Sequence, residues 1–258
     1  MKFSIIIPAH NEEAYIGKCL DSIDRASVSF PEDVEIIVVI NRCDDTTEDI
    51  AIARGARIVH EDAKNLAIIR NAGAKIASAD IIVTIDADSL MSQETLTRID
   101  CALKSGKYIG GGAYIRPERY SLGIWTTLII LRIILLLTGL TGGLYWCRKR
   151  DFDAVGGFNE KVIMGEDLEF ASRLKQYGKK KGLKFITLPK AVITTSMRKF
   201  DKFGDWYFLK TMLFNTGKIK KLMRGEYLDE HFRFADEFFY EFSKDSNEET
   251  NKEKNLKQ

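Results

Sequence analysis

The stretch Ile81–Asp88 reads IIVTIDAD, so an apolar run of strand-forming residues ends in two carboxylates separated by one residue. A strand without a polar face is typical of a parallel sheet that is covered on both sides. In open α/β sheets, ligands bind beyond the carboxyl ends of the strands, which is where Asp86 and Asp88 are expected. Two hard oxygen ligands there suit Mg²⁺ or Mn²⁺ carrying a substrate diphosphate, because Mg²⁺ takes its other ligands from phosphate and water. A second interpretation, in which the pair only caps the next helix, stays open from this stretch alone.

The composition fits a folded protein in a reducing compartment. With 258 residues, of which 45% are apolar, the chain is long enough for one large α/β domain or a domain with an appendage. Lys and Arg number 39 against 37 Asp and Glu, so the net charge of +2 predicts no nucleic-acid partner. The four cysteines lack the close pairs of a zinc site and the density of a disulfide scaffold, which favours a cytoplasmic location.

Short apolar runs alternate with helical patterns in the first half of the chain, which predicts right-handed βαβ units and a parallel sheet. The predicted strands are Ser4–Pro8, Val34–Ile40, Ala56–Val59 and Asp80–Ile85. The predicted helices lie near Glu12–Arg25, Thr46–Arg54, Leu66–Ala77 and Gln93–Lys104. Thr46 and Ser92 have side chains typical of helix N-caps. The first strand begins close to the N-terminus, without the cleavage region of a signal peptide.

The pattern becomes less regular after Tyr108, which predicts one domain over residues 1–242 with two halves. Residues 1–106 are expected to bind a nucleotide-sugar and residues 107–242 to face an acceptor. Residues 243–258 contain a single apolar residue, Leu256, so this tail is predicted to be disordered.

Five short motifs follow one another along the chain, and their combination in this order is more specific than any one of them. They are residues 5–13 (IIIPAHNEE), Arg70–Gly73 (RNAG), Asp86–Asp88 (DAD), Gly156–Phe158 (GGF) and Gly165–Glu169 (GEDLE). The combination resembles family 2 glycosyltransferases over about residues 3–200. This resemblance implies the GT-A fold, an α/β class with a Rossmann-like, mostly parallel central sheet flanked by helices and a C-terminal helical region on the acceptor side.

The resemblance also implies which residues hold the donor. It places along the nucleoside Pro8, Ala9, His10 and Glu12. Asn71 and Ala87 are expected beside the substrate as parts of their motifs, and Arg70 suits a diphosphate because its guanidinium is bidentate and does not titrate. Asn41 stands where relatives often carry Asp to bind the base, so the base preference stays open. From the residues alone, His10 could instead simply end a strand, and Arg70 could instead lie on the surface of a helix.

The same resemblance divides the acidic residues between metal and acceptor. Asp88 is implied as a ligand of the divalent cation, with Asp86 at the ribose or metal-bound water. None of the three histidines is expected as a further ligand. Glu166 and Asp167 open a helical pattern, where acidic residues are common in any case. The resemblance makes Asp167 the general base and Glu166 a residue that positions the acceptor or the loop.

Two further segments bear on the acceptor. Residues 194–200 (TTSMRKF) resemble a basic-aromatic segment that closes over the diphosphate in some relatives, with Arg198 supplying charge. The Gln and Trp of processive relatives are missing, which predicts one sugar per encounter. The apolar stretch 122–140 is close to the length of a membrane span, but a span would put Asp88 and Asp167 on opposite sides of the bilayer. It is therefore predicted to be a buried helix, a homodimer surface or a helix in the membrane interface.

The sequence thus predicts a metal-dependent inverting glycosyltransferase that uses Mg²⁺ or Mn²⁺ and a UDP- or GDP-type sugar donor. Its acceptor would be a glycan or a lipid-linked glycan, and its location the cytoplasm or the inner face of the membrane. Two alternatives remain. One is a sugar nucleotidyltransferase, which the Glu166–Asp167 pair disfavours, and the other is a catalytically silent protein that binds nucleotide-sugars.

Overall fold

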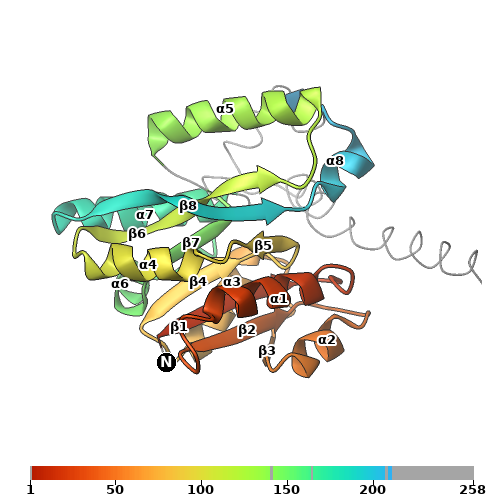
Figure 1. Cartoon of the computed structure of the whole chain (residues 1–258), viewed down its shortest axis with the longest axis horizontal. Coiled ribbons are helices and arrows are strands. Elements are labelled where there is room, and N and C mark those ends of the chain that lie inside the picture. Colours follow the sequence, from red (N-terminus) through yellow and green to blue (C-terminus); the bar gives the residue numbers. More distant parts are fainter. Residues whose placement is uncertain (1, 140–141, 164, 207–208, 211–258) are drawn as a thin grey trace, which may run out of the picture.

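A computed structural model of the chain describes residues 2–139, 142–163, 165–206 and 209–210. Its strands are β1 (Phe3–Ala9), β2 (Val34–Ile40), β3 (Arg57–His60), β4 (Ile81–Ile85), β5 (Ser89–Met91), β6 (Tyr108–Pro117), β7 (Leu144–Arg148) and β8 (Lys184–Thr195). Its helices are α1 (Ile16–Ser27), α2 (Thr47–Ala53), α3 (Leu66–Ile76), α4 (Thr95–Lys104), α5 (Leu122–Thr138), α6 (Lys149–Ala154), α7 (Glu166–Lys180) and α8 (Arg198–Phe203). The strands form one sheet in the order β3-β2-β1-β4-β7-β6-β8-β5 (Figure 1).

The first four strands form the parallel sheet that the sequence predicts. β3, β2, β1 and β4 are neighbours and all run parallel. The predicted bounds of β2 match the structure. Those of β4 differ by one residue at its start, and those of β1 and β3 differ by one residue at both ends. β1 shows why this half was predictable: Phe3, Ile5 and Ile7 point to one hydrophobic core and Ile6 to the other, so each side chain is buried whichever face it occupies.

The helix starts were less predictable. The first helix begins at Ile16 rather than near Glu12. The predicted cap at Ser92 is wrong, because α4 begins at Thr95 and the Ser92 hydroxyl shares a hydrogen bond with Thr95 Oγ1 at 2.8 Å. Thr46 does precede α2, but the backbone N–H of Thr47 donates to the Asp45 carboxylate at 2.9 Å instead.

The second half of the sheet is mixed. β7 lies antiparallel between β4 and β6 and so joins the two halves of the chain. β6 pairs in parallel with β8, and the short β5 pairs antiparallel with β8. Four of the seven pairings are therefore parallel, which agrees with the predicted mostly parallel sheet.

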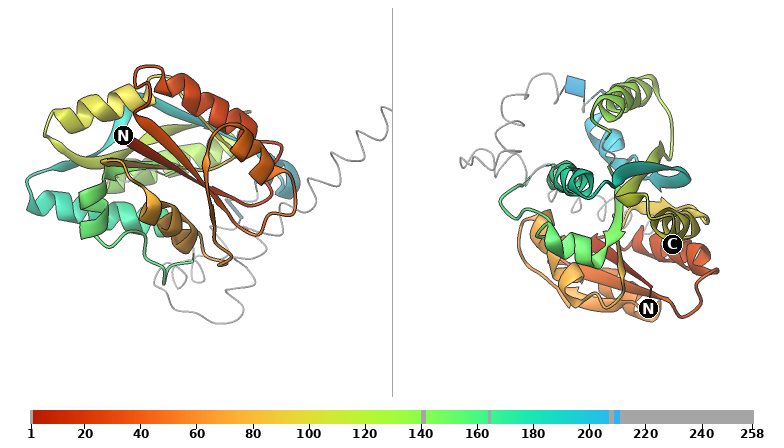
Figure 2. Two further views of the ribbon diagram at one scale, coloured as in Figure 1. Left: turned by 90° about the horizontal axis from the view of Figure 1, so that it is seen from below. Right: turned by 90° about the vertical axis from the view of Figure 1, so that its left-hand side faces the viewer.

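Helices cover both faces of the sheet, as a sheet of buried strands requires. One core packs α1, α2 and α4 against the strands, and the other packs α3, α6 and α7 (Figure 2). α3 lies especially close to the sheet at Gly73, where a Cβ atom would come within 2.5 Å of the Ile6 side chain and 2.9 Å of Val39. The glycine of the RNAG motif is thus a packing requirement.

Helix α5 lies at the edge of the molecule, beyond β6 and β8 and next to α8 (Figure 1). Ile124 and Thr127 are buried and Leu128 and Ile130 are half-buried, whereas other large apolar side chains between residues 122 and 133 are exposed. Exposed in this way are Leu122, Trp125, Ile129, Leu131 and Ile133. The interpretation as a core helix is therefore wrong for residues 122–133, whose side chains the structure describes. Among the described helices, none has the length and apolar character needed to cross a bilayer.

The predicted disordered tail at 243–258 and most of the C-terminal helical region lie outside the described residues. The division into a 1–106 half and a 107–242 half stays a prediction.

A buried carboxylate ties the strands together at the end of the sheet opposite to the ligand edge. Glu35 accepts hydrogen bonds from Ser4 Oγ at 2.5 Å, from Ser78 N at 2.6 Å and from Arg57 Nη1 at 2.6 Å. Burial raises the pKa of Glu35, but these hydrogen bonds outweigh it and hold the pKa at about 2.

Glu35 should therefore matter for stability in acid. Its stabilisation is fully present above the ordinary Glu pKa and is lost as the pH falls toward about 2. Glu35→Gln should lower the unfolding free energy at pH 7 by about 1.5–3 kcal/mol, as for hydrogen bonds to a charged group. The variant should also lose less stability than wild type between pH 5 and pH 2. Urea denaturation at several pH values measures both, and equal acid sensitivity in the two proteins would contradict the assignment.

Candidate functional site

The carboxyl ends of β1, β2 and β4 meet at one edge of the sheet. The register pairs Ala9 with Ile40, so the residues that follow β1 and β2 lie side by side. Pro8 and Ala9 are the last residues of β1 and are buried, and Ala87 is buried between the two aspartates that follow β4. This is the edge at which the sequence predicted a ligand.

Two loops at this edge have strained backbones and are joined by hydrogen bonds. Asn11 after β1 and Arg42 after β2 both have positive φ, 52° and 50°. The Asn11 Nδ2 donates to the Asp44 carboxylate at 2.5 Å, and Asp44 N donates back to Asn11 Oδ1 at 2.9 Å. Backbone strain of this kind persists where the surrounding structure fixes it, and often at functional sites.

His10 and Asn41 lie between these loops. The His10 Nδ1 is 2.6 Å from the Asn41 carbonyl oxygen, and burial lowers the pKa of His10. The Asn41 side chain is buried and donates to the carbonyl oxygens of Glu61 and Ala63. Its amide donors are thus engaged within the chain, and its contact with a nucleobase stays a prediction.

Arg70 joins the two acidic motifs of the sequence. From α3 its guanidinium donates to Asp86 Oδ1 at 2.8 Å and to Glu166 Oε1 at 2.5 Å. Arg70 and Glu166 are both buried, and the Phe158 ring lies 5.4 Å from the Arg70 guanidinium carbon. The Arg70 Nε is buried without a hydrogen-bond partner among the described residues. Segments 96 residues apart in the sequence thus meet in one site.

Asn71, the neighbour of Arg70, holds a turn. Its side-chain amide donates to the Phe158 carbonyl oxygen at 2.9 Å and accepts from Phe158 N at 2.9 Å. Gly156 and Gly157 both have positive φ, as the predicted turn requires, and Phe158 is buried against Phe170. In this structure Asn71 positions the GGF motif, and its predicted substrate contact stays untested.

Arg198 makes a second charged centre. It donates two hydrogen bonds to the Glu12 carboxylate, one of them 2.7 Å long, and its Nη2 is 3.4 Å from Asp88 Oδ2. Its guanidinium lies over the Tyr15 ring at 4.7 Å from the centroid. Next to it, burial lowers the pKa of Lys199, while the Asp88 charge opposes this shift. Burial raises the pKa of Asp88.

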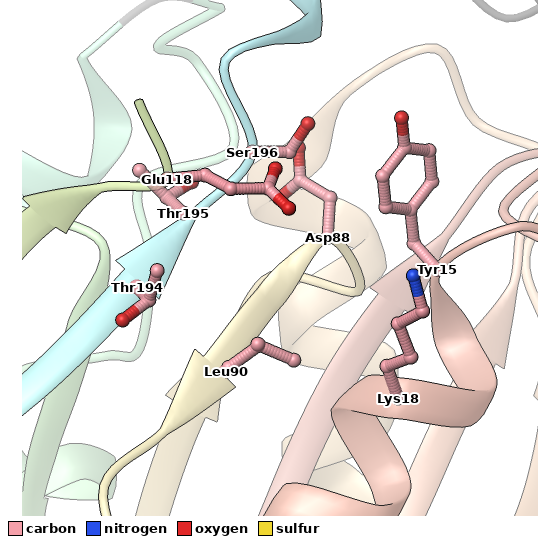
Figure 3. A pocket seen from close by; sticks show the side chains of 8 residues that line it. All are labelled: Tyr15, Lys18, Asp88, Leu90, Glu118, Thr194, Thr195 and Ser196. Carbon is pink, nitrogen blue, oxygen red and sulfur yellow. The ribbon is translucent and has the colours of Figure 1, made fainter. Parts of the chain in front are cut away.

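A small open cleft lies beside Asp88. Its lining comes from the start of α1, from β5, from the residue that follows β6 and from the end of β8 (Figure 3). The lining residues are Tyr15, Lys18, Asp88, Leu90, Glu118, Thr194, Thr195 and Ser196. Asp88 is therefore reachable from solvent through a polar opening.

Asp167 lies at the start of α7, as the sequence predicts. It accepts hydrogen bonds from the Tyr145 hydroxyl at 3.3 Å and from Leu168 N at 2.7 Å. Burial raises the pKa values of Glu166 and Asp167, and the Arg70 charge opposes the rise. A carboxylate with a raised pKa, fixed by two donors, suits proton transfer.

The acidic residues fit a divalent cation that is shared with a ligand. The described residues contain no group of three or more His, Cys, Asp or Glu side chains that could hold a metal alone. Asp86 and Asp88 supply hard oxygen atoms at the ligand edge, and Asp88 lines the cleft. Mg²⁺ and Mn²⁺ sites of this kind complete their shell with phosphate oxygens and water.

Comparison with known proteins identifies the family. Residues 4–142, more than half of the chain, match the family model described as Glycosyl transferase family 2. The chain belongs to this family. The match includes the first three motifs of the sequence but ends before Glu166 and Asp167. The roles of these two residues therefore rest on the geometry around α7.

Relatives of this glycosyltransferase family member match part of its length. The uncharacterized glycosyltransferase EpsJ of Bacillus subtilis is 36% identical over 101 residues, which are 37% of this chain and 28% of EpsJ. The dolichol-phosphate mannosyltransferase of Pyrococcus furiosus is 30% identical over 124 residues, 45% of this chain and 34% of that protein. The matched regions thus span well under half of these relatives.

A solved structure supports the fold. The mannosyltransferase PcManGT from Pyrobaculum calidifontis, in complex with GDP-Man and Mn²⁺, superposes with a TM-score of 0.62. The superposition covers 75% of this chain and 56% of that one at 21% identity. At this identity the likeness concerns the fold, and it confirms the predicted GT-A architecture.

The structure brings most predicted site residues to one edge of the sheet, in two charged centres rather than one. Three residues near these centres were not predicted. Tyr145 lies in an apolar strand, Tyr15 belongs to none of the motifs, and Lys199 lies in the basic-aromatic segment 194–200 without a predicted role of its own. Their proximity to Asp167, Arg198 and Asp88 is visible only in three dimensions.

Arg70 should be essential for folding as well as for the site. Arg70→Gln leaves Glu166 buried without its partner, which should lower the unfolding free energy by about 3–5 kcal/mol. Adding Glu166→Gln should restore part of that loss, because the unpaired charge is then removed. Urea denaturation of both variants tests this. Arg98→Gln, which breaks an exposed pair with Glu94, is the control and should change stability by less than about 1 kcal/mol. Equal losses in the single and double variants would contradict the pairing.

Proposed function

We propose that the chain transfers one sugar from a nucleoside diphosphate sugar to an acceptor hydroxyl with inversion at the anomeric carbon. One observation carries the proposal: the Arg70 guanidinium lies between Asp86 and Glu166, at 2.8 Å and 2.5 Å. This contact puts the carboxylates at the end of β4 next to those at the start of α7. A site for a leaving diphosphate and a site for a base are thereby adjacent, as a single displacement needs.

The donor half of the site is suited to an anion. We propose that Asp88 and Asp86 would hold Mg²⁺ or Mn²⁺, which supplies Lewis-acid stabilisation of the departing diphosphate. Arg70 adds a fixed positive charge near the same position. His10 and the ends of β1 and β2 would border the nucleoside. The expected donor is a UDP- or GDP-type sugar.

The acceptor half is built around Asp167. We propose that Asp167 takes the proton of the acceptor hydroxyl while that oxygen forms its bond to the anomeric carbon and the bond to the diphosphate oxygen breaks. The Tyr145 hydroxyl, 3.3 Å from Asp167 Oδ2, orients the carboxylate. Because Arg70 binds Glu166, the role of Glu166 is to place Arg70 and the start of α7.

The two alternative functions are less well supported. A sugar nucleotidyltransferase has no evident use for a second buried carboxylate pair beside the first. A silent binding protein would not need a base with a raised pKa next to the donor site.

Two isosteric variants separate donor binding from chemistry. Asp88→Asn should lose the Mn²⁺-dependent rise in melting temperature caused by nucleoside diphosphate sugars, because a metal ligand is gone. Asp167→Asn should keep that rise but lose transfer by roughly 10²–10⁴-fold, the usual effect of a lost general base. In wild type, transfer should fall as the pH drops through the raised pKa of Asp167, since the base is then protonated. Thermal shift and a transfer assay measure these effects, and full transfer by Asp167→Asn would refute the assigned base.

We also propose that the acceptor is lipid-linked and that the exposed side of α5 rests on a membrane surface. Helix α5 carries no Asp or Glu and exposes Arg132 among its apolar side chains. Arg119 next to α5 pairs with Asp201 and Asp205 around α8, so the surface is connected to the helix that begins in the site. The Pyrococcus relative is named for a dolichol-phosphate substrate, which supports the idea. A membrane-bound enzyme of this kind would act on the cytoplasmic face.

Two polar substitutions test this surface. Trp125→Ser with Leu131→Ser should remove co-sedimentation with anionic liposomes while the protein stays folded, because both side chains are exposed, by 56% and 44%. Val28→Ser, at an exposed apolar residue on another face, is the control and should keep co-sedimentation. Circular dichroism checks the fold. A wild-type protein that stays in the supernatant with every liposome composition would refute the membrane contact and leave the homodimer surface as the better explanation.

A further inference from the structure

Arg198 occupies a position that the proposed metal also needs. Its Nη2 is 3.4 Å from Asp88 Oδ2, and its side chain is only 13% exposed. A divalent ion on Asp88 would bring a second positive charge close to this guanidinium. Like charges at such a separation repel strongly in a partly buried site, because solvent screens them poorly.

The contacts of Arg198 are unequal. Its bond to Glu12 is bidentate, with one hydrogen bond of 2.7 Å, whereas its contact with Asp88 is a single longer one. Glu12 is itself fixed, because it is buried and its backbone N–H donates to Thr47 Oγ1 at 2.7 Å. The Tyr15 ring supports the guanidinium from one side. Arg198 can therefore leave Asp88 while Glu12 and Tyr15 still hold it.

The position of Arg198 in the chain makes such a movement local. Arg198 is the first residue of the short helix α8, three residues after Thr195 at the end of β8. The Ser196 N–H donates to the Asp88 carbonyl oxygen at 3.2 Å, which keeps the segment that leads into α8 beside the proposed metal ligand. A rotation of the Arg198 side chain about its Glu12 contact requires no rearrangement of the sheet.

We propose that Arg198, held in place by Glu12, is the counter-cation of Asp88 in the absence of ligands. When the donor diphosphate binds, Arg198 moves away from Asp88 and the metal binds there instead. The diphosphate offers the guanidinium a new anionic partner at the moment when the metal displaces it. Metal and donor then bind together, and the metal alone binds weakly. Glu12 is a positioning residue that acts through Arg198. This inference rests on the proposed function.

Mn²⁺ binding in the absence of a sugar donor tests the proposal. The free Mn²⁺ signal in electron paramagnetic resonance gives the affinity without any turnover. Arg198→Gln should bind Mn²⁺ at least about tenfold more tightly than wild type when no nucleotide is present, because a unit charge close to Asp88 has gone. Adding UDP or GDP should tighten Mn²⁺ binding strongly in wild type and much less in Arg198→Gln. Unchanged or weaker nucleotide-free binding by Arg198→Gln would overturn the proposal.

Two further variants control for charge and for folding. Lys202→Gln removes an exposed cation of the same helix and should leave Mn²⁺ affinity within about twofold of wild type, since exposed charges are well screened. The double variant Glu12→Gln with Arg198→Gln removes both charges of the Glu12–Arg198 pair, so it should fold even if Arg198→Gln alone does not. If Glu12 acts through Arg198, Glu12→Gln should alter Mn²⁺ affinity in wild type but not in the Arg198→Gln background. An equal effect in both backgrounds would overturn the positioning role.

The outcomes also separate this inference from the proposed function. If wild type binds Mn²⁺ in the presence of UDP or GDP but Arg198→Gln shows no gain without nucleotide, the metal-dependent function stands and the counter-cation role is wrong. If neither protein binds Mn²⁺ with or without nucleotide, both fail.

Discussion

The buried guanidinium of Arg70 is the constraint on which the arrangement of this molecule depends. A charge in the interior is tolerated only when it is paired, and here its partners come from different halves of the chain, Asp86 after β4 and Glu166 at the start of α7. The Arg70 guanidinium lies over the Phe158 ring, 5.4 Å from its centroid. The pairing requirement therefore fixes α7 against the parallel half of the sheet and places two acidic centres side by side.

The RNAG motif satisfies this constraint with a different contact from each of three residues. Arg70 points to the carboxylates, and Asn71 holds the backbone of Phe158 with two hydrogen bonds. Gly73 lets α3 approach β1 and β2 more closely than any side chain would allow. One helical turn thus serves the charge balance, the turn after α6 and the packing on the sheet.

The parallel strands of the first half could be predicted from the sequence, whereas the pairing of the later strands could not, for physical reasons. The strands β1, β2 and β4 are mainly apolar on both faces, and β1 to β4 alternate with helices, so local pattern was enough. β6 and β8 run next to each other although 66 residues separate their ends at Pro117 and Lys184, and β7 inserts between β4 and β6 in the opposite direction. No local period encodes such pairings. The N-cap at Ser92 failed because its hydroxyl is used by Thr95, the first residue of the helix.

The sequence by itself determined the residue types of the site: carboxylates after an apolar strand, more carboxylates at a helix start and an arginine that precedes both in the chain. Only the tertiary structure decided which charges meet. Glu12 and Arg198 are 186 residues apart, and Arg70 reaches Glu166 across 96 residues, yet both pairs are in contact. Tyr145 comes within hydrogen-bonding distance of Asp167 through β7. Ion pairing and pKa depend on distance and burial in space, and these follow from sheet order and helix packing rather than from neighbouring residues in the chain.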